Sequence, residues 1–293
     1  MRAMISVLAL VVIAPAAVAQ TSDGKAIDIW PNLAPGETTR ETGEKMPIRQ
    51  SENPPVTRVI NIRKPTLDVY AANKPNGVGV LILPGGGFGK VVPDMEGSEA
   101  ATILNKIGIS AFVLNYRTMK ASSDVGWKRP LQDAQRAMSW VRSNRDKWHL
   151  HGDKIGILGF SAGGQVAARL LTDGGMLAYE RVDDLDRVSH RPDFALLIYP
   201  WNMYDKATDE LVTGIHVSKI VPPTFIVHTH DDASTSLGSV LFYVGLKKAG
   251  VDAELHVYQN GGHGYGTRPR PNSNIGTWPD RMVDWLRTRE LAE

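Results

Sequence analysis

The sequence predicts an α/β fold: a single domain with a mainly parallel central sheet and helices on both of its faces. Three observations predict it. From residue 78 onward, apolar runs of strand length alternate with segments in which apolar residues recur every three or four positions. The strand runs are apolar throughout, as in strands that are buried on both faces. No internal repeat and no second unit interrupts the alternation in these 293 residues.

The N-terminal part of the chain precedes this alternation. Residues 20–55 are rich in Pro, Gly, Glu and Thr and show little periodicity, so we expect an extended segment packed on a domain that comprises residues 56–293. Two short runs with β character follow, residues 57–62 and 66–71, joined through Lys64-Pro65. They predict an antiparallel pair at one edge of the sheet.

The alternating region gives the remaining elements in order. Strands are expected at residues 78–83, 109–114, 155–160, 194–199, 224–228 and 254–258. Helices are expected to begin at Glu96 and at Pro130 and to cover residues 162–171, 236–249 and 279–291. Because ligands of open parallel sheets bind at the carboxyl ends of the strands, functional residues are expected in the segments that follow the strands.

The composition is that of an ordinary soluble globular protein, with 42% hydrophobic residues, 22% charged residues and a formal net charge of +2. Lysines and arginines are scattered, and no basic run suggests a groove for nucleic acid, so we expect no nucleic-acid partner. The chain has no cysteine, so we expect its stability to come from its core rather than from disulfides.

The first 19 residues have the pattern of a secretory signal peptide. Arg2 gives a positive start, residues 4–13 form an apolar core, and residues 17–19 read Ala-Val-Ala, a small-residue cleavage site. The apolar core is too short to span a membrane, and no cysteine is present to carry a lipid anchor. A buried N-terminal helix is the alternative. The pattern favours cleavage after Ala19 and export to the periplasm or the extracellular space, without a stable membrane anchor.

One motif carries chemical meaning. Residues 159–163 read Gly-Phe-Ser-Ala-Gly, directly after a predicted strand and directly before a predicted helix. In this context the turn is so sharp that a side chain at either glycine would collide with a neighbouring strand or helix, and the serine is raised above the sheet. Hydrolases present a nucleophile in this way, so Ser161 is the predicted catalytic nucleophile.

A serine hydroxyl needs a base within hydrogen-bond distance and a carboxylate that orients the base. Hydrolases with this turn place the acid, and then the histidine, after the serine. His263 lies in a glycine-rich stretch after the last predicted strand and is the predicted base, with an ordinary surface histidine as the alternative. Asp231 and Asp232 both follow the strand at 224–228, and both are candidates for the acid.

The same region raises the question of a metal. His228 and His230 alternate at the end of the strand and, with Asp231, resemble metal ligands. Nothing nearby completes a tetrahedral set, so we expect no metal and no cofactor.

A glycine-rich loop offers the remaining part of a hydrolase site. Attack on a carbonyl builds negative charge on its oxygen, and preorganised backbone N–H groups stabilise that charge. Residues 84–89 read Pro-Gly-Gly-Gly-Phe-Gly after the first central strand. The predicted oxyanion hole is formed by the N–H groups of Gly86, Gly87 and Ala162. A phosphate-binding loop is disfavoured because no Gly-Lys-Ser/Thr follows, and a plain turn is the other alternative.

The sequence resembles the secreted α/β-hydrolases related to acetyl xylan esterases and to bifunctional acetyl xylan/feruloyl esterase-like proteins. The resemblance extends from about residue 29 to the last helix. It rests on Trp30-Pro31, Ala34-Pro35-Gly36, residues 84–88, Glu96-Gly97, residues 131–137, residues 159–164 and residues 261–264. The resemblance implies a single α/β-hydrolase domain.

The resemblance also implies which aspartate is the acid. In such enzymes a histidine at the strand end is followed by three residues, the acid, two residues and a valine. Counting from His228 makes Asp232 the acid and puts Thr235 where valine is usual, so Asp231 stays as the alternative acid. The segment at 171–194 is rich in Asp and Arg and does not resemble the hydrophobic lid of a lipase.

By this resemblance the function is that of a secreted serine carboxylesterase that removes small acyl groups, acetyl first, from carbohydrate. The alternatives are a broad small-ester hydrolase, a peptidase similar to prolyl oligopeptidase, and a non-catalytic carbohydrate-binding protein on a hydrolase scaffold. Trp201 and Tyr265 are the candidate substrate-binding residues. Trp127, Tyr204 and Trp278 also fall in predicted loops, where they either stack on sugar rings or pack in the core.

Overall fold

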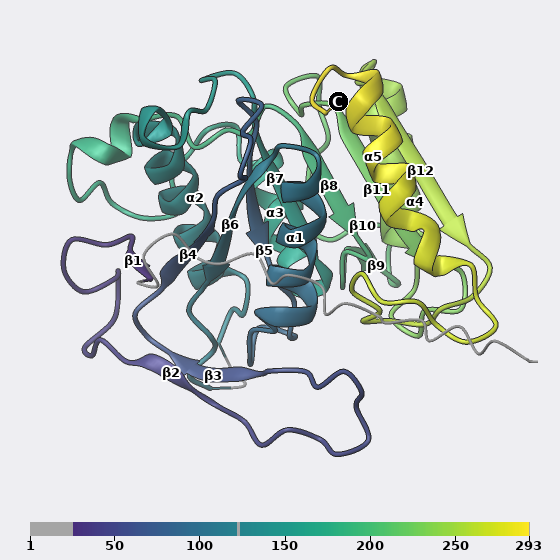
Figure 1. The fold of residues 1–293 in the computed structure, drawn as a ribbon, viewed down its shortest axis with the longest axis horizontal. Helices are drawn as coiled ribbons and strands as arrows, with labels where there is room; N and C mark the ends of the chain where they lie inside the picture. The colour runs from purple at the N-terminus through teal and green to yellow at the C-terminus, as the bar shows by residue number, and fades with distance from the viewer. Residues whose placement is uncertain (1–25, 122–123, 293) are drawn as a thin grey trace, which may run out of the picture.

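The structure is a computed structural model that describes residues 26–121 and 124–292. The predicted signal peptide, residues 1–19, lies outside the described residues. A large, mostly parallel sheet runs through the molecule, and helices lie on both sides of it (Figure 1). The predicted α/β fold is confirmed.

Within the described residues, eight strands form the central sheet. Their bounds are β1 Ile27–Asp28, β4 Thr66–Tyr70, β5 Gly79–Leu83, β6 Ser110–Asn115, β7 Ile155–Phe160, β8 Ala195–Ile198, β11 Thr224–Thr229 and β12 Ala253–Tyr258. They lie side by side in the order β1-β4-β6-β5-β7-β8-β11-β12. The consecutive strands β6, β5, β7, β8, β11 and β12 of this order are parallel to one another, whereas β4 is antiparallel to both of its neighbours.

Five helices of the described part of the chain cover the two faces of this sheet. They are α1 Glu99–Lys106, α2 Lys128–Ser143, α3 Ser161–Leu171, α4 Leu237–Ala249 and α5 Trp278–Thr288. Alternate side chains of a strand point to opposite faces. Val80 and Ile82 of β5 therefore pack in one core cluster with α1 and α5, while Leu81 and Leu83 pack in the other with α2, α3 and α4. The helix predicted at Pro130 begins slightly earlier, at Lys128.

Short elements complete the fold. A π-helical turn, η1 Asp94–Ser98, leads into α1, and three 3-10 turns follow later in the chain: η2 Arg145–Trp148, η3 Asp184–Arg187 and η4 Ile275–Thr277. Two small antiparallel sheets lie outside the central sheet. They are formed by β2 Thr42–Lys45 with β3 Val59–Ile62, and by β9 Tyr204–Asp205 with β10 Glu210–Leu211.

The pairing predicted between residues 57–62 and 66–71 is wrong. The strand β3 within the first run pairs with β2, and the strand β4 within the second run lies between β1 and β6. Both edges of β4 are occupied, so no edge is left for β3. The N-terminal segment contributes β1 to the central sheet and β2 to a second sheet. The weak periodicity of this segment did not predict either strand.

That N-terminal segment also reaches the core. Ile29 and Trp30 are buried, and Trp30 Nε1 donates a hydrogen bond of 2.9 Å to Asp133 Oδ1 on α2. The Pro35 carbonyl accepts a hydrogen bond of 2.6 Å from Arg117, which follows β6. The described part of the segment is therefore built into the domain, and it is not only laid over its surface.

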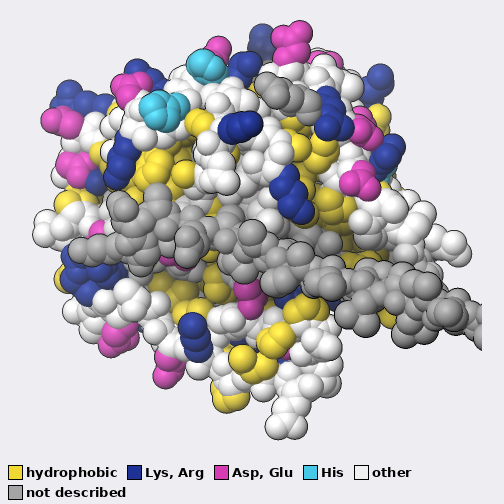
Figure 2. All heavy atoms as spheres, viewed as in Figure 1, with side chains coloured by type: hydrophobic (Ala, Val, Ile, Leu, Met, Phe, Trp, Pro, Cys, Tyr) yellow, Lys and Arg dark blue, Asp and Glu magenta, His cyan; other side chains and the backbone are white. Residues whose placement is uncertain are grey.

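The parallel strands end at one edge of the sheet. The segments that follow β5, β7, β8, β11 and β12 hold the glycine-rich loop, Ser161, Trp201, Asp232 and His263, respectively. Among the described residues visible in Figure 2, basic and acidic side chains are interspersed and form no patch of a single sign. Among helices within residues 26–121 and 124–292, none is long and apolar enough to cross a membrane.

Candidate active site

The turn at Ser161 is tight. Ser161 is the first residue of α3 and follows β7 directly, with a backbone φ of 50° in the left-handed region that non-glycine residues rarely adopt. A Cβ on Gly159 would lie 2.6 Å from the Gly163 carbonyl oxygen, and a Cβ on Gly163 would lie 2.1 Å from the Leu83 carbonyl oxygen. The predicted requirement for glycine on both sides of the serine is confirmed.

Ser161, His263 and Asp232 form a continuous hydrogen-bonded chain. Ser161 Oγ lies 2.7 Å from His263 Nε2, and His263 Nδ1 lies 2.6 Å from Asp232 Oδ2. Because an ionised carboxylate can only accept, Nδ1 carries the ring proton and Nε2 accepts from the serine hydroxyl. The imidazole is therefore in the position and the tautomer needed to take the hydroxyl proton when Oγ attacks an electrophilic carbon.

Four donors surround the buried Asp232 carboxylate. Oδ2 accepts from His263 Nδ1 and, at 2.9 Å, from His228 Nε2, while Oδ1 accepts from the Ser234 N–H and hydroxyl, each at 2.7 Å. Burial alone raises the pKa of a carboxyl, but these hydrogen bonds outweigh it and hold the pKa of Asp232 far below its usual value. Asp232 is therefore ionised at neutral pH.

His228 was missed as a partner of the acid. Its ring is buried, Nε2 contacts Asp232, and Nδ1 lies 2.8 Å from Ser239 Oγ on α4. Both ring nitrogens are therefore engaged. The four-residue spacing from His228 to Asp232 was the available signal. Within the two described ranges, no group of three or more His, Cys, Asp or Glu side chains is arranged to hold a metal ion.

Asp231, the alternative acid, faces a different part of the histidine loop. Its carboxylate accepts hydrogen bonds from the N–H groups of Gly262, at 2.9 Å, and Gly261, at 3.2 Å. The Gly262 bond lowers the pKa of Asp231, which lies at the surface. Asp231 thus holds the backbone that leads to His263, while Asp232 contacts the imidazole itself.

The glycine-rich loop presents free N–H groups beside this chain of side chains. Gly86 and Gly87 have φ values of 137° and 63°, conformations that L side chains rarely adopt. None of the described residues accepts a hydrogen bond from the N–H of either glycine. Ala162 lies in the first turn of α3, where N–H groups have no acceptor within the helix. Such groups can stabilise a negative oxygen.

Glu96 links the glycine-rich loop to the histidine loop. It is 3% exposed, and its carboxylate accepts hydrogen bonds of 2.7 Å from both the Gly85 N–H and the Tyr199 hydroxyl. The Tyr199 oxygen in turn accepts from the Gly266 N–H at 2.9 Å, and the tyrosine ring packs edge-on against His263. Burial raises the pKa of Glu96. The motif Glu96-Gly97 was noted in the sequence, but nothing local reveals these distant contacts.

The two predicted substrate-binding residues, Trp201 and Tyr265, differ in how far their side chains are exposed. Trp201 is half-buried, its N–H donates to the Ser161 carbonyl oxygen at 2.9 Å, and its ring packs edge-on against Phe88. Tyr265 is fully buried and packs edge-on against Tyr199, with ring centroids 4.3 Å apart. The prediction for Tyr265 is corrected because its side chain has no exposed surface for a substrate to contact.

Other aromatic residues from predicted loops also differ in how far they are buried. Trp278 begins α5 and is buried, with Nε1 donating to the Gly266 carbonyl oxygen at 2.9 Å. Trp127 is half-buried at the start of α2, and Tyr204 donates its hydroxyl to Asp209. Trp127 and Trp201 both line a cavity of about 270 Å³ that reaches Gly87 of the glycine-rich loop.

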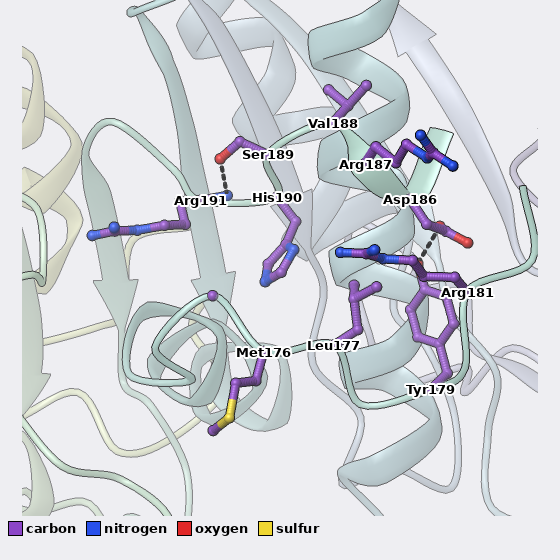
Figure 3. A pocket seen from close by; sticks show the side chains of 11 residues that line it. Met176, Leu177, Tyr179, Arg181, Asp186, Arg187, Val188, Ser189, His190 and Arg191 are labelled. Atoms are coloured by element: carbon purple, nitrogen blue, oxygen red, sulfur yellow. Dashed lines mark hydrogen bonds between the residues drawn. The ribbon is translucent and has the colours of Figure 1, made fainter. Parts of the chain in front are cut away.

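Of two further cavities in the described structure, one adjoins the histidine loop and the other lies away from the three residues of the hydrogen-bonded chain. One, of about 490 Å³, adjoins Gly264 and Tyr265 and is lined by the side chains of Arg58, Arg268 and Arg270. Another, of about 450 Å³, is formed by residues 175–191 and contains neither Ser161 nor its two partners (Figure 3).

Comparison with known proteins places this geometry in a family. A family model described as BD-FAE matches residues 67–191, a span that includes the glycine-rich loop and Ser161. The solved structure of an acetyl ester-xyloside bifunctional hydrolase from Caldicellulosiruptor lactoaceticus is 30% identical, with a TM-score of 0.71 over 95% of this chain and 100% of that one. The chain belongs to the acetyl xylan esterase-like α/β hydrolases. It is accordingly an enzyme of the hydrolase class.

Curated relatives of this hydrolase are longer. An acetylxylan esterase from Xylanibacter ruminicola is 27% identical over 233 residues, which are 71% of this chain and 44% of that protein. An endo-1,4-beta-xylanase B from Butyrivibrio fibrisolvens is 32% identical over 204 residues, which are 63% and 32% of the two chains. The chain thus spans less than half the length of these relatives. A thermophilic esterase from Thermogutta terrifontis, 19% identical with a TM-score of 0.66, shares the fold.

Proposed function

We propose that this hydrolase is an exported serine carboxylesterase that removes acetyl and other small acyl groups from carbohydrate. One observation carries the proposal: the hydrogen-bonded chain from Ser161 through His263 to Asp232. Ser161 is the nucleophile, His263 the general base, and Asp232 the acid that orients the base. Asp231 supports the backbone of the histidine loop.

The reaction proceeds in two steps. Ser161 Oγ attacks the ester carbonyl carbon while His263 Nε2 takes the hydroxyl proton, and the N–H groups of Gly86, Gly87 and Ala162 stabilise the oxyanion. The tetrahedral intermediate then breaks its bond to the sugar oxygen, which receives the proton from His263, and an acyl-serine remains. Water, deprotonated by the same imidazole, attacks the acyl-serine and releases the carboxylic acid and free Ser161.

The carbohydrate part of the proposal is supported by the relatives and by the cavity at the site. The names of an acetylxylan esterase, a xylanase and an acetyl ester-xyloside bifunctional hydrolase, all of them other proteins, refer to xylan or xylosides, and two of the three also refer to acetyl groups. The cavity beside Gly87 is lined by Trp127 and Trp201, and aromatic faces of this kind contact the apolar faces of sugar rings.

The first experiment measures hydrolysis of p-nitrophenyl esters of increasing chain length. We expect acetate to be cleaved faster than butyrate or longer esters, and Ser161→Ala and His263→Ala each to remove nearly all activity. Robust activity in both variants would refute the mechanism. If the wild type cleaves no ester at all, the non-catalytic alternative is favoured.

The second experiment compares acetate release from acetylated xylan with release from acetylated pectin and with cleavage of feruloylated oligosaccharides. We expect acetylated xylan to be deacylated. If no carbohydrate is deacylated while a peptide ester is cleaved, the carbohydrate proposal fails and the peptidase alternative gains.

Export rests on the pattern of residues 1–19. The full chain expressed in a bacterial host should be found outside the cytoplasm with Gln20 as its N-terminal residue. Intact protein retaining Met1 in the cytoplasm would contradict this part of the proposal.

A further inference from the structure

Among the described residues, three arginines are buried, and one of them differs from the other two. Arg117 lies 2.9 Å from a carboxylate oxygen of Asp133, and Arg136 lies 2.7 Å from one of Asp186. Arg169, which is 6% exposed, has no carboxylate partner within the described part of the chain. Burying a charge without a counter-charge is costly, so this arrangement calls for a functional reason.

The contacts of Arg169 leave part of its guanidinium free. The group lies over the Trp127 ring, 4.1 Å from the ring centroid, and Nη1 donates a hydrogen bond of 3.1 Å to the Thr213 carbonyl oxygen. None of the described residues accepts a hydrogen bond from Nε or Nη2. Burial lowers the pKa of Arg169, and no nearby acid offsets this effect. The positive charge is therefore held in place but is not neutralised.

The position of Arg169 relates it to the nucleophile. Ser161, Gln165 and Arg169 are spaced four residues apart on α3, so their side chains leave the same face of the helix. Arg169 lies about 12 Å along the helix axis from Ser161, and helical side chains tilt toward the N-terminus. Arg169 lines the same cavity as Gly87 of the glycine-rich loop, which connects its guanidinium to the neighbourhood of the proposed oxyanion hole.

The surroundings of Arg169 form a cavity. Gln165 and Arg169 line the space of about 270 Å³ that also contacts Trp127, Trp201 and Gly87. Gln165 Nε2 donates to the Asn202 carbonyl oxygen, while Gln165 Oε1 is buried without a partner. The residues that line the cavity thus include an unpaired cation, a buried acceptor without a partner and aromatic side chains, next to the proposed oxyanion hole.

We propose that this cavity is a subsite for a sugar that carries a carboxylate, a uronosyl residue of the acylated carbohydrate. The inference rests on the proposed function, whose substrate it narrows. Nε and Nη2 of Arg169 bind the carboxylate, since the planar fork of a guanidinium matches the two carboxylate oxygens. Trp201 contacts the ring, and Gln165 Oε1 accepts from a sugar hydroxyl.

The cavity in Figure 3 contains charged side chains that have partners, unlike Arg169. Asp186 accepts hydrogen bonds there from the Tyr179 hydroxyl and from Arg136, and Arg191 donates to the Ile220 carbonyl oxygen. Arg187 is exposed and lies 3.3 Å from an oxygen of Asp184. Its charge is thus paired at the surface, which makes Arg187 a suitable control position.

The test uses two acetylated xylo-oligosaccharides that differ only in a glucuronosyl branch next to the acetylated sugar. The ratio of the two kcat/KM values, measured by acetate release, is compared among variants, because the folded fraction of each variant cancels in its own ratio. We expect the wild type to favour the branched substrate by about tenfold or more. Arg169→Gln should bring the ratio close to one, Arg169→Lys should keep part of the preference, and Arg187→Gln should keep all of it.

A second measurement needs no variant. Methyl glucuronoside should inhibit hydrolysis of p-nitrophenyl acetate by the wild type at a concentration about tenfold lower than methyl glucoside, and added salt should reduce the difference. The subsite is overturned, and the esterase proposal is left standing, by any of three results. These are equal inhibition by the two methyl glycosides, equal kcat/KM values of the wild type for the two oligosaccharides, and an unchanged preference for the branched oligosaccharide in Arg169→Gln. A wild type that cleaves neither oligosaccharide nor p-nitrophenyl acetate overturns both.

Discussion

Replacing each of the two neighbouring aspartates by asparagine separates their roles. In Asp232→Asn, one carboxylate oxygen becomes an amide nitrogen that only donates. If that nitrogen takes the place of Oδ2, it meets the N–H groups of His263 and His228; if it takes the place of Oδ1, it meets the N–H and hydroxyl of Ser234. Either orientation sets donors against each other. The change therefore cannot be absorbed by a flip of the amide.

The expected loss of activity follows from the tautomer of His263. With an amide N–H opposite Nδ1, the ring is favoured with its proton on Nε2, which then cannot accept the proton of Ser161. A triad acid changed in this way typically costs about 10⁴ in kcat. In Asp231→Asn the amide oxygen still accepts from Gly262, and only one exposed backbone hydrogen bond is weakened. An effect of less than about tenfold is expected there.

The assay is steady-state hydrolysis of p-nitrophenyl acetate from pH 6 to 8, with circular dichroism to confirm that both variants are folded. The pKa of Asp232 is held far below this range, so the wild-type acid stays ionised and the ratio of wild-type to Asp232→Asn rates should not depend on its titration. A folded Asp232→Asn enzyme with near wild-type kcat, or a larger loss in Asp231→Asn, would refute the reasoning.

Two further predictions concern the framework of the site. Glu96→Gln should lower kcat more than it raises KM. Burial raises the pKa of Glu96 above its ordinary value of 4.5. The protonated carboxyl therefore stabilises the folded protein below pH 4.5, and this stabilisation is lost as the pH rises through the folded-state pKa. Between pH 4 and pH 8, Tm should fall more in the wild type than in Glu96→Gln. Parallel slopes would contradict this. In Gly163→Ala the new Cβ would lie 2.1 Å from the Leu83 carbonyl oxygen, so the free energy of unfolding in urea should fall by about 3 kcal/mol or more. In the control Gly89→Ala no atom lies within 4 Å of the new Cβ, so the free energy of unfolding should change by about 0.5 kcal/mol or less. Equal effects would show that the turn is not as tight as the contacts require.

The features predicted correctly from the sequence depend on local patterns. The strand at 155–160 has the predicted bounds, because its apolar run ends where Gly159 and the serine turn begin. Ser161 was identified from five adjacent residues. The order of the segments along a parallel sheet predicted that His263 and either Asp231 or Asp232 would lie near Ser161, and the family resemblance favoured Asp232; the structure brings Asp232 and His263 to the edge of the sheet where Ser161 lies.

The features that were missed depend on contacts between distant segments. Tyr265 follows His263 by two residues and lies in a glycine-rich loop, yet it is buried because Tyr199 packs against it from the end of β8. Glu96 begins as an ordinary helix-start residue, and only the folded chain brings Gly85 and Tyr199 to its carboxylate. Periodicity reports which side of an element is buried, and it does not report what lies opposite.

The helix α3 connects the chemistry to the choice of substrate. Its first turn carries Ser161 and the N–H of Ala162, and its third turn carries Arg169 on the same face. The first turn is fixed by close backbone contacts at Gly163, so Ser161 has little freedom to move. The far end of the Arg169 side chain contacts Trp127 and Thr213, which lie outside that turn. In the proposed enzyme, substitutions around the cavity should therefore alter which sugar is accepted while leaving the geometry of Ser161 and His263 intact, and a change at Gly163 should reduce activity toward every ester alike.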